Sequence, residues 1–72
     1  MRYAIVIEKA ASNYAAFVPD LPGCVATGST QSDVRRLIAE AIQLHIETLH
    51  LSGDRVPEPS TLVDYIDVAG AA

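Results

Sequence analysis

The sequence predicts an α+β fold in the order β-β-β-α-β, an antiparallel sheet with one long helix packed on it. Residues 2–27 are rich in apolar residues at alternate positions and are divided by tight turns, which is typical of a β-meander. From Thr30 the apolar residues recur at helical spacing for about six turns. The chain has 72 residues, enough for one small domain. We expect that domain to span residues 1–69, followed by a frayed tail at residues 70–72.

The first three strands are predicted from alternation and from the turn residues between them. β-Branched residues alternate along residues 2–10, which are expected to form the first strand. Residues 12–13 (Ser-Asn) give a turn signal before the second strand, residues 14–18. The third strand is short, residues 24–27, and ends at Gly28.

The helix and the last strand are bounded by recognisable start and stop residues. Thr30, followed three residues later by Asp33, is close to a capping box, with Asp in place of the usual Glu or Gln. Gly53 supplies the left-handed stop. The proline-rich residues 56–60 favour an extended crossover, and residues 61–69 then alternate like a fourth strand.

The apolar arc of the helix is wider than one sheet requires. At about 100° per residue it covers roughly half of the circumference, whereas a one-sided surface helix needs an arc of only about 100°. Two interpretations follow: the helix is sunk deep in its own core, or it shares one edge with a second copy. A domain of this size removes only about 60% of its unfolded surface from water, which favours association. We therefore predict an oligomer interface at Ile42, Ile46 and Leu49.

The charge balance favours a protein partner over a nucleic acid. Nine acidic residues against five basic ones give a formal net charge of −4. Phosphate binding needs clustered Lys and Arg, so direct nucleic-acid binding by this chain is not expected, whereas a basic protein would be attracted. No apolar run reaches the roughly 20 residues of a membrane helix, and no signal peptide precedes the first strand. Together with a single cysteine, this predicts a cytoplasmic location.

The residues capable of chemistry do not form a recognisable catalytic set. Cys24 has no base or positive charge beside it in sequence, so we expect a small buried hydrophobe rather than a nucleophile. His45 lies in the apolar stripe of the helix and His50 on the polar side, so they do not form a metal-binding pair. The carboxylates do not converge as a two-metal nuclease would require. We predict no catalytic residue, metal or cofactor; an enzyme or ligand-binding domain that uses Cys24 or His45 stays as an alternative.

The stretch "PDLPG", residues 19–23, predicts a rigid corner. Its prolines fix φ, Asp20 can bond to nearby backbone, and Gly23 accepts positive φ. Leu21 lies between the prolines and is either an exposed apolar contact for a partner or a plug for the core. Both interpretations stay open from the sequence.

Three segments together resemble the HicB-like antitoxin family. They are "FVPDLPGCVATG" (residues 17–28), "AEAIQLHIETL" (residues 39–49) and "VPEPS" (residues 56–60), in the order and spacing of that family. The helix opens with "TQSDVRR", where family members usually carry more acids. The resemblance covers residues 1–68 and implies a partial RNase-H-like domain without the nuclease carboxylates.

The resemblance also implies a function. Such a domain is a non-enzymatic antitoxin that binds and occludes a small, basic, mRNA-cleaving HicA-type toxin and forms dimers or tetramers. Many members add a C-terminal DNA-binding domain, which we do not expect in this chain. We expect the toxin contacts at Glu8, Asp20, Leu21 and Pro22. The alternative is a solitary oligomeric adaptor domain that binds some other protein.

Overall fold

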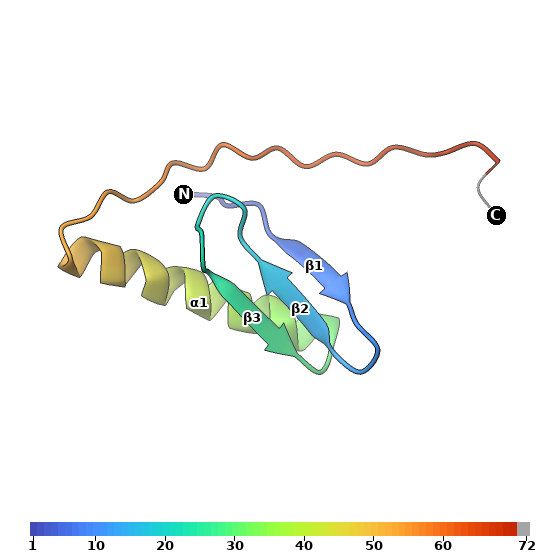
Figure 1. Ribbon diagram of the computed structural model, residues 1–72, viewed down its shortest axis with the longest axis horizontal. Helices are drawn as coiled ribbons and strands as arrows, with labels where there is room; N and C mark the ends of the chain where they lie inside the picture. The colour runs from blue at the N-terminus through green and yellow to red at the C-terminus, as the bar shows by residue number, and fades with distance from the viewer. Residues whose placement is uncertain (71–72) are drawn as a thin grey trace.

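A computed structural model describes residues 1–70 and has the expected α+β class. Strands β1 (Val6–Lys9), β2 (Tyr14–Phe17) and β3 (Val25–Gly28) form one antiparallel sheet in the order β1-β2-β3. Helix α1 (Gln31–Leu51) lies across one face of this sheet (Figure 1). Within the described chain, β1 and β3 are therefore both edge strands.

The strand register sorts the side chains onto two faces of the sheet. Val6 lies opposite Phe17 on the neighbouring strand, and Phe17 lies opposite Val25 on the third. Because neighbouring residues of a strand point to opposite faces, these three share the face away from the helix, whereas Ala16 points toward it and is buried. The sheet therefore has a covered face and an open face.

Helix α1 begins and ends at the predicted residues. The Thr30 hydroxyl accepts a hydrogen bond from the Asp33 amide (3.0 Å), and Gly53 adopts φ +72° after the last turn. The helix has 21 residues, about 31 Å at its usual rise. Each strand has four residues, about 13 Å. The C-terminal half of α1 therefore extends past the sheet, as Figure 1 shows.

The predicted fourth strand does not form in the single chain. After α1, the described residues run extended as far as Val68 without pairing as a strand, and residues 61–70 are exposed. A strand needs a neighbouring edge for its backbone groups, and alternation alone does not supply one. We call residues 54–70 the tail. Residues 71–72, which belong to the predicted frayed end, lie outside the described residues.

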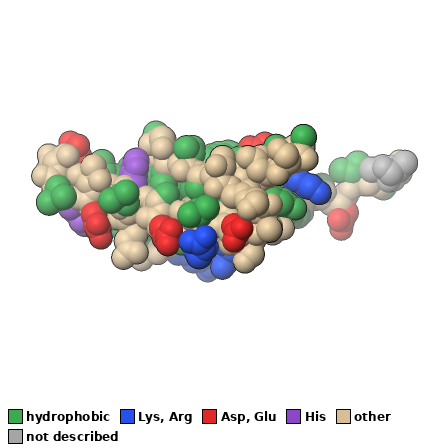
Figure 2. All heavy atoms as spheres, turned by 90° about the horizontal axis from the view of Figure 1, so that it is seen from below, with side chains coloured by type: hydrophobic (Ala, Val, Ile, Leu, Met, Phe, Trp, Pro, Cys, Tyr) green, Lys and Arg blue, Asp and Glu red, His purple; other side chains and the backbone are tan. Residues whose placement is uncertain are grey.

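The tail makes the molecule longer than a compact domain of this size. Its Cα radius of gyration is 14.4 Å and its principal extents are 50 × 27 × 16 Å. A compact chain of this length would have a radius of gyration of about 11 Å. Figure 2 shows the tail projecting beyond the body, with hydrophobic side chains on it.

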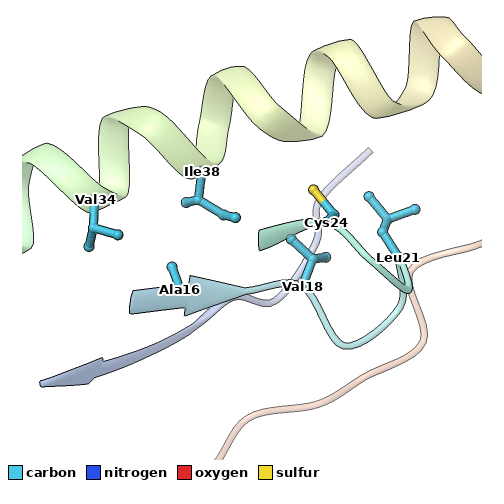
Figure 3. Packing of buried hydrophobic residues seen from close by; sticks show 6 residues of the cluster. All are labelled: Ala16, Val18, Leu21, Cys24, Val34 and Ile38. Atoms are coloured by element: carbon cyan, nitrogen blue, oxygen red, sulfur yellow. The ribbon is translucent and has the colours of Figure 1, made fainter. Parts of the chain in front are cut away.

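The core lies between the covered face of the sheet, the helix and the corner at residues 18–24. Figure 3 shows Val34 and Ile38 pointing down from α1 onto the sheet and the corner. The six buried hydrophobic residues are Ala16, Val18, Leu21, Cys24, Val34 and Ile38. Half of them come from the corner, so this loop is part of the core rather than a surface connector.

Candidate protein-binding surface

The corner between β2 and β3 is closed by its own backbone. The Leu21 amide donates to the Val18 carbonyl (3.1 Å), and the Cys24 amide donates to the Leu21 carbonyl (3.0 Å). The Val18 amide in turn donates to the Cys24 carbonyl (3.2 Å). Gly23 has φ +82°, a conformation that favours glycine. The corner is therefore rigid, as its sequence predicts.

This closure turns Leu21 inward. Its side chain is 0% exposed and points toward α1 beside Cys24 (Figure 3). Of the two interpretations left open by the sequence, the core plug holds. The prediction of Leu21 as an exposed partner contact is corrected, because two successive turns fold the residue beneath the corner and leave no side-chain surface to touch.

Asp20, in the same corner, holds the tail. One carboxylate oxygen accepts from the backbone amides of Ser60 and Thr61 (both 3.0 Å), and the other accepts from their hydroxyls (3.1 and 2.8 Å). We call this set of four hydrogen bonds the Asp20 clasp. The bonds lower the pKa of Asp20 to about 2, those from Thr61 contributing most.

The clasp joins two segments that the sequence analysis treated separately. The "PDLPG" corner and the end of "VPEPS" are 40 residues apart, yet the clasp ties them together. The Tyr3 hydroxyl donates to the Pro57 carbonyl and adds a second tie to the tail. The sequence signal for the clasp was the pair of hydroxyl residues, Ser60 and Thr61, that follows Pro59. Helical or strand periodicity cannot reveal that such residues bond to Asp20.

Of the four predicted toxin contacts, Glu8 and Pro22 have exposed side chains. Glu8 lies on the same face of the sheet as Val6, two residues away. That face also carries Phe17 (39% exposed) and Val25 (64% exposed). We call Val6, Glu8, Phe17 and Val25 the open sheet face. Pro22 lies at the corner, three residues before Val25 in the sequence.

The predicted oligomer residues lie on α1 but are not its most exposed apolar side chains. Ile42, Ile46 and Leu49 are half-buried, and Ile42 packs against the core. Leu44 and Leu51 are the large hydrophobic residues of the helix that are exposed to water. In Figure 2, hydrophobic side chains and acidic groups alternate along the body.

Cys24 and His45 both line a shallow hollow between the corner and the helix. The hollow has a volume of about 210 Å³ and is also lined by Leu44 and Thr48. Burial raises the pKa of the Cys24 thiol. A nucleophilic cysteine needs the opposite shift, so this geometry favours a packed thiol over a reactive one.

Over residues 1–70 there is no cluster of three or more His, Cys, Asp or Glu side chains able to hold a metal ion. The described part of the chain also contains no helix long and apolar enough to cross a membrane.

A protein-family model described as the HicB-like antitoxin of bacterial toxin–antitoxin systems matches residues 3–70. The chain belongs to this family. The match covers the three strands, the helix and the tail, so the family assignment includes both partners of the Asp20 clasp.

Relatives and solved structures agree with the HicB-like assignment. An uncharacterised 14.9 kDa protein of Haemophilus phage HP1 is 37% identical over 67 residues, which are 93% of this chain. The chain spans 50% of the length of that relative. A UPF0150 protein of Thermoplasma acidophilum is 36% identical over 58 residues, 79% of this chain and 84% of the relative.

The fold is similar to a chain in the solved structure of the HicA3 and HicB3 toxin–antitoxin complex. The TM-score is 0.71 at 34% sequence identity, and the similarity covers 82% of this chain and 69% of that chain. The HicB-like family and the α+β architecture are therefore established by sequence and by structure.

Proposed function

We propose that this HicB-like chain is a non-enzymatic antitoxin that binds and occludes a small, basic, mRNA-cleaving HicA-type toxin in the cytoplasm. The observation that carries the proposal is the similarity to a chain of a toxin–antitoxin complex across 82% of this chain. The family match over residues 3–70 and the net charge of −4 support it, because an acidic body attracts a basic partner.

The open sheet face is our candidate for the toxin contact. It combines an apolar row, Val6, Phe17 and Val25, with the carboxylate of Glu8. Interfaces commonly pair an aromatic or aliphatic centre with a charged rim. Pro22 would extend this surface at the corner. Asp20 would act indirectly, since its carboxylate is engaged by the tail.

Binding to a purified HicA-type toxin tests this proposal. The wild-type chain should bind the toxin and block its cleavage of mRNA. Phe17→Glu should weaken binding by about tenfold or more, because it introduces a charge into the centre of the proposed interface. Gln43→Glu adds the same charge at an exposed position of α1 and should leave binding unchanged. Equal effects of the two variants would remove the open sheet face as the toxin contact, and failure of the wild-type chain to bind any HicA-type toxin would overturn the function.

We further propose that the chain forms homo-oligomers. The half-buried helix residues Ile42, Ile46 and Leu49 are the predicted contacts, and the small core favours association. Replacement of Ile46 by Asp should then dissociate the oligomer. Sedimentation unchanged by this substitution would remove the helix edge as the interface.

A further inference from the structure

The tail contains an apolar extended segment that is not paired with the sheet. Between Leu62 and Val68, every large apolar side chain is between 56% and 94% exposed; these residues are Leu62, Val63, Tyr65, Ile66 and Val68. The backbone there is extended, but within the described residues it is not paired with any strand. Solitary exposed apolar residues are ordinary, whereas a contiguous run of this kind marks an interaction site.

The distribution of these side chains indicates a strand covered on both sides. In an extended chain, Leu62, Asp64, Ile66 and Val68 point one way, and Val63, Tyr65 and Asp67 point the other. Each face is therefore mostly apolar and carries one carboxylate, and a strand with large apolar residues on both faces is typical of a sheet that other elements cover. Residues 62–68 are therefore better suited to pair with a sheet edge and be covered by other elements than to remain exposed to solvent.

The matching edge is on β1. Residues 2–5 lead into β1 but are not paired as a strand within the described chain. A groove of about 460 Å³ lies just before β1, between Arg2, Tyr3 and Ala4 and the chain's own Ser60, Thr61 and Leu62. The edge from Tyr3 to Lys9 has the same length as the segment Leu62–Val68, about 23 Å in extended conformation.

Charge complements this match in length. The edge carries a basic residue near each end, Arg2 and Lys9, with Glu8 beside Lys9, and the tail carries Asp64 and Asp67. Opposite charges on paired strands are favourable, whereas like charges are not.

We propose that Leu62–Val68 is the fourth strand of a second copy's sheet: two chains exchange tails, and each tail pairs with the free β1 edge of the other chain. The Asp20 clasp fixes Ser60 and Thr61 and so sets where the exchanged part begins. Beyond the clasp, Tyr65 lies across a hollow of about 430 Å³ from Ile5 and Ile7 of its own chain, but the tail does not pair with β1 there. Pro57 and Pro59 keep the approach extended and limit the ordering cost of binding. Exchange gives each β1 edge and each tail a partner.

This inference deepens the homo-oligomer part of the proposed function and is tested without toxin. Isotope-labelled and unlabelled chains are mixed in denaturant and refolded together, and isotope-filtered NOE spectra then report only contacts between chains. We expect contacts from the Ile66 methyls to the methyls of Ile5 and Ile7 on the covered face, and from the Tyr65 ring to the Val6 methyls on the open face. Contacts confined within one chain, contacts between tails alone, or their absence would each overturn the exchange.

A matched pair of substitutions gives the second measurement. Ile66→Asp should raise the dimer dissociation constant by about 100-fold or more, since it would bury a charge in the exchanged strand. Leu51→Asp, at an equally exposed residue at the end of α1, should leave it unchanged. The Ile66 variant should retain its far-UV CD spectrum, because the side chain is 83% exposed in the single chain.

If Ile66→Asp leaves the dimer dissociation constant unchanged while Ile46→Asp dissociates the dimer, the exchange is overturned in favour of the helix interface. A chain that is monomeric at every concentration would overturn both interfaces. Toxin binding by the wild-type chain is scored separately, so each of these outcomes is distinguishable from a failure of the antitoxin function.

Discussion

At the scale of single residues, Asp20 joins two segments that lie 40 residues apart in sequence. Its carboxylate accepts four hydrogen bonds from two consecutive residues of the tail. The sequence placed Asp20 correctly in a rigid corner, but it assigned the carboxylate to a partner protein. The structure assigns it to the chain's own Ser60 and Thr61.

Loss of the Asp20 charge should release the tail from the corner. In Asp20→Asn, one oxygen is replaced by an amide donor, so the donors on Ser60 and Thr61 lose part of their acceptor set. Hydrogen exchange of the Ser60 and Thr61 amides should become severalfold faster, while Asp54→Asn should have no effect. Unchanged exchange at both amides would mean that the clasp does not form in solution.

The clasp should also fail in acid. The folded-state pKa of Asp20 is about 2, below its usual value of about 3.9. A carboxyl whose pKa is lowered by folding contributes its full stabilisation above the unfolded pKa and loses it as the pH falls toward the folded pKa. Tail attachment, followed by the same amide exchange corrected for its intrinsic pH dependence, should weaken between about pH 4 and pH 2.

Truncation of Leu21 should destabilise the body rather than affect binding directly. The side chain is fully buried, so Leu21→Ala should cost about 2–5 kcal/mol of unfolding free energy. In a small domain this lowers the melting temperature by roughly 8 °C or more. Leu51→Ala, which removes the same atoms from an exposed residue, should change it by less than about 0.5 kcal/mol. Equal melting temperatures for the two variants would contradict the plug.

At the scale of elements, the junction of β3 with α1 depends on the absence of a side chain at Gly28. A Cβ there would lie 2.8 Å from the Val34 backbone nitrogen and 3.1 Å from its Cα. These are backbone atoms of the first helical turn, so they cannot rotate away, and helix and sheet would have to separate.

Gly28→Ala should therefore cost about 1–3 kcal/mol in chemical denaturation. Thr27→Ala, an exposed strand residue beside it, is the control and should cost less than about 1 kcal/mol. A Gly28 variant as stable as the control would show that the junction can open at little cost.

Local patterns predicted the elements that are stabilised locally. Alternation predicted three strands; the first two are shorter than expected and the third is shifted by one residue. The caps at Thr30 and Gly53 predicted the helix ends. The prediction of the fourth strand was wrong for the single chain. Residues 61–69 have strand propensity, but a strand needs a sheet edge to pair with, and propensity does not indicate which chain supplies that edge. The candidate site was half predictable: Glu8 and Pro22 are exposed, whereas the position of Leu21 and the bonds of Asp20 depend on contacts distant in sequence.

At the scale of the whole molecule, the radius of gyration of 14.4 Å reflects a body with a projecting tail. If a second copy covers the tail, folding and association are linked, and thermal stability depends on protein concentration. The melting temperature should rise as the concentration increases above the dissociation constant. The rise should disappear in Ile66→Asp, and a melting temperature independent of concentration in the wild-type chain would contradict this linkage.

The uncovered tail also bears on the lifetime of a solitary copy. Proteases cleave exposed, extended backbone far more readily than packed helices or strands, and residues 62–68 offer such a stretch while the clasp keeps the body intact. In a chain that has not dimerised, proteases would remove this segment of the tail first, and the chain could no longer pair it with a second copy. Assembly would then protect the chain from degradation, so its survival would increase with its own abundance.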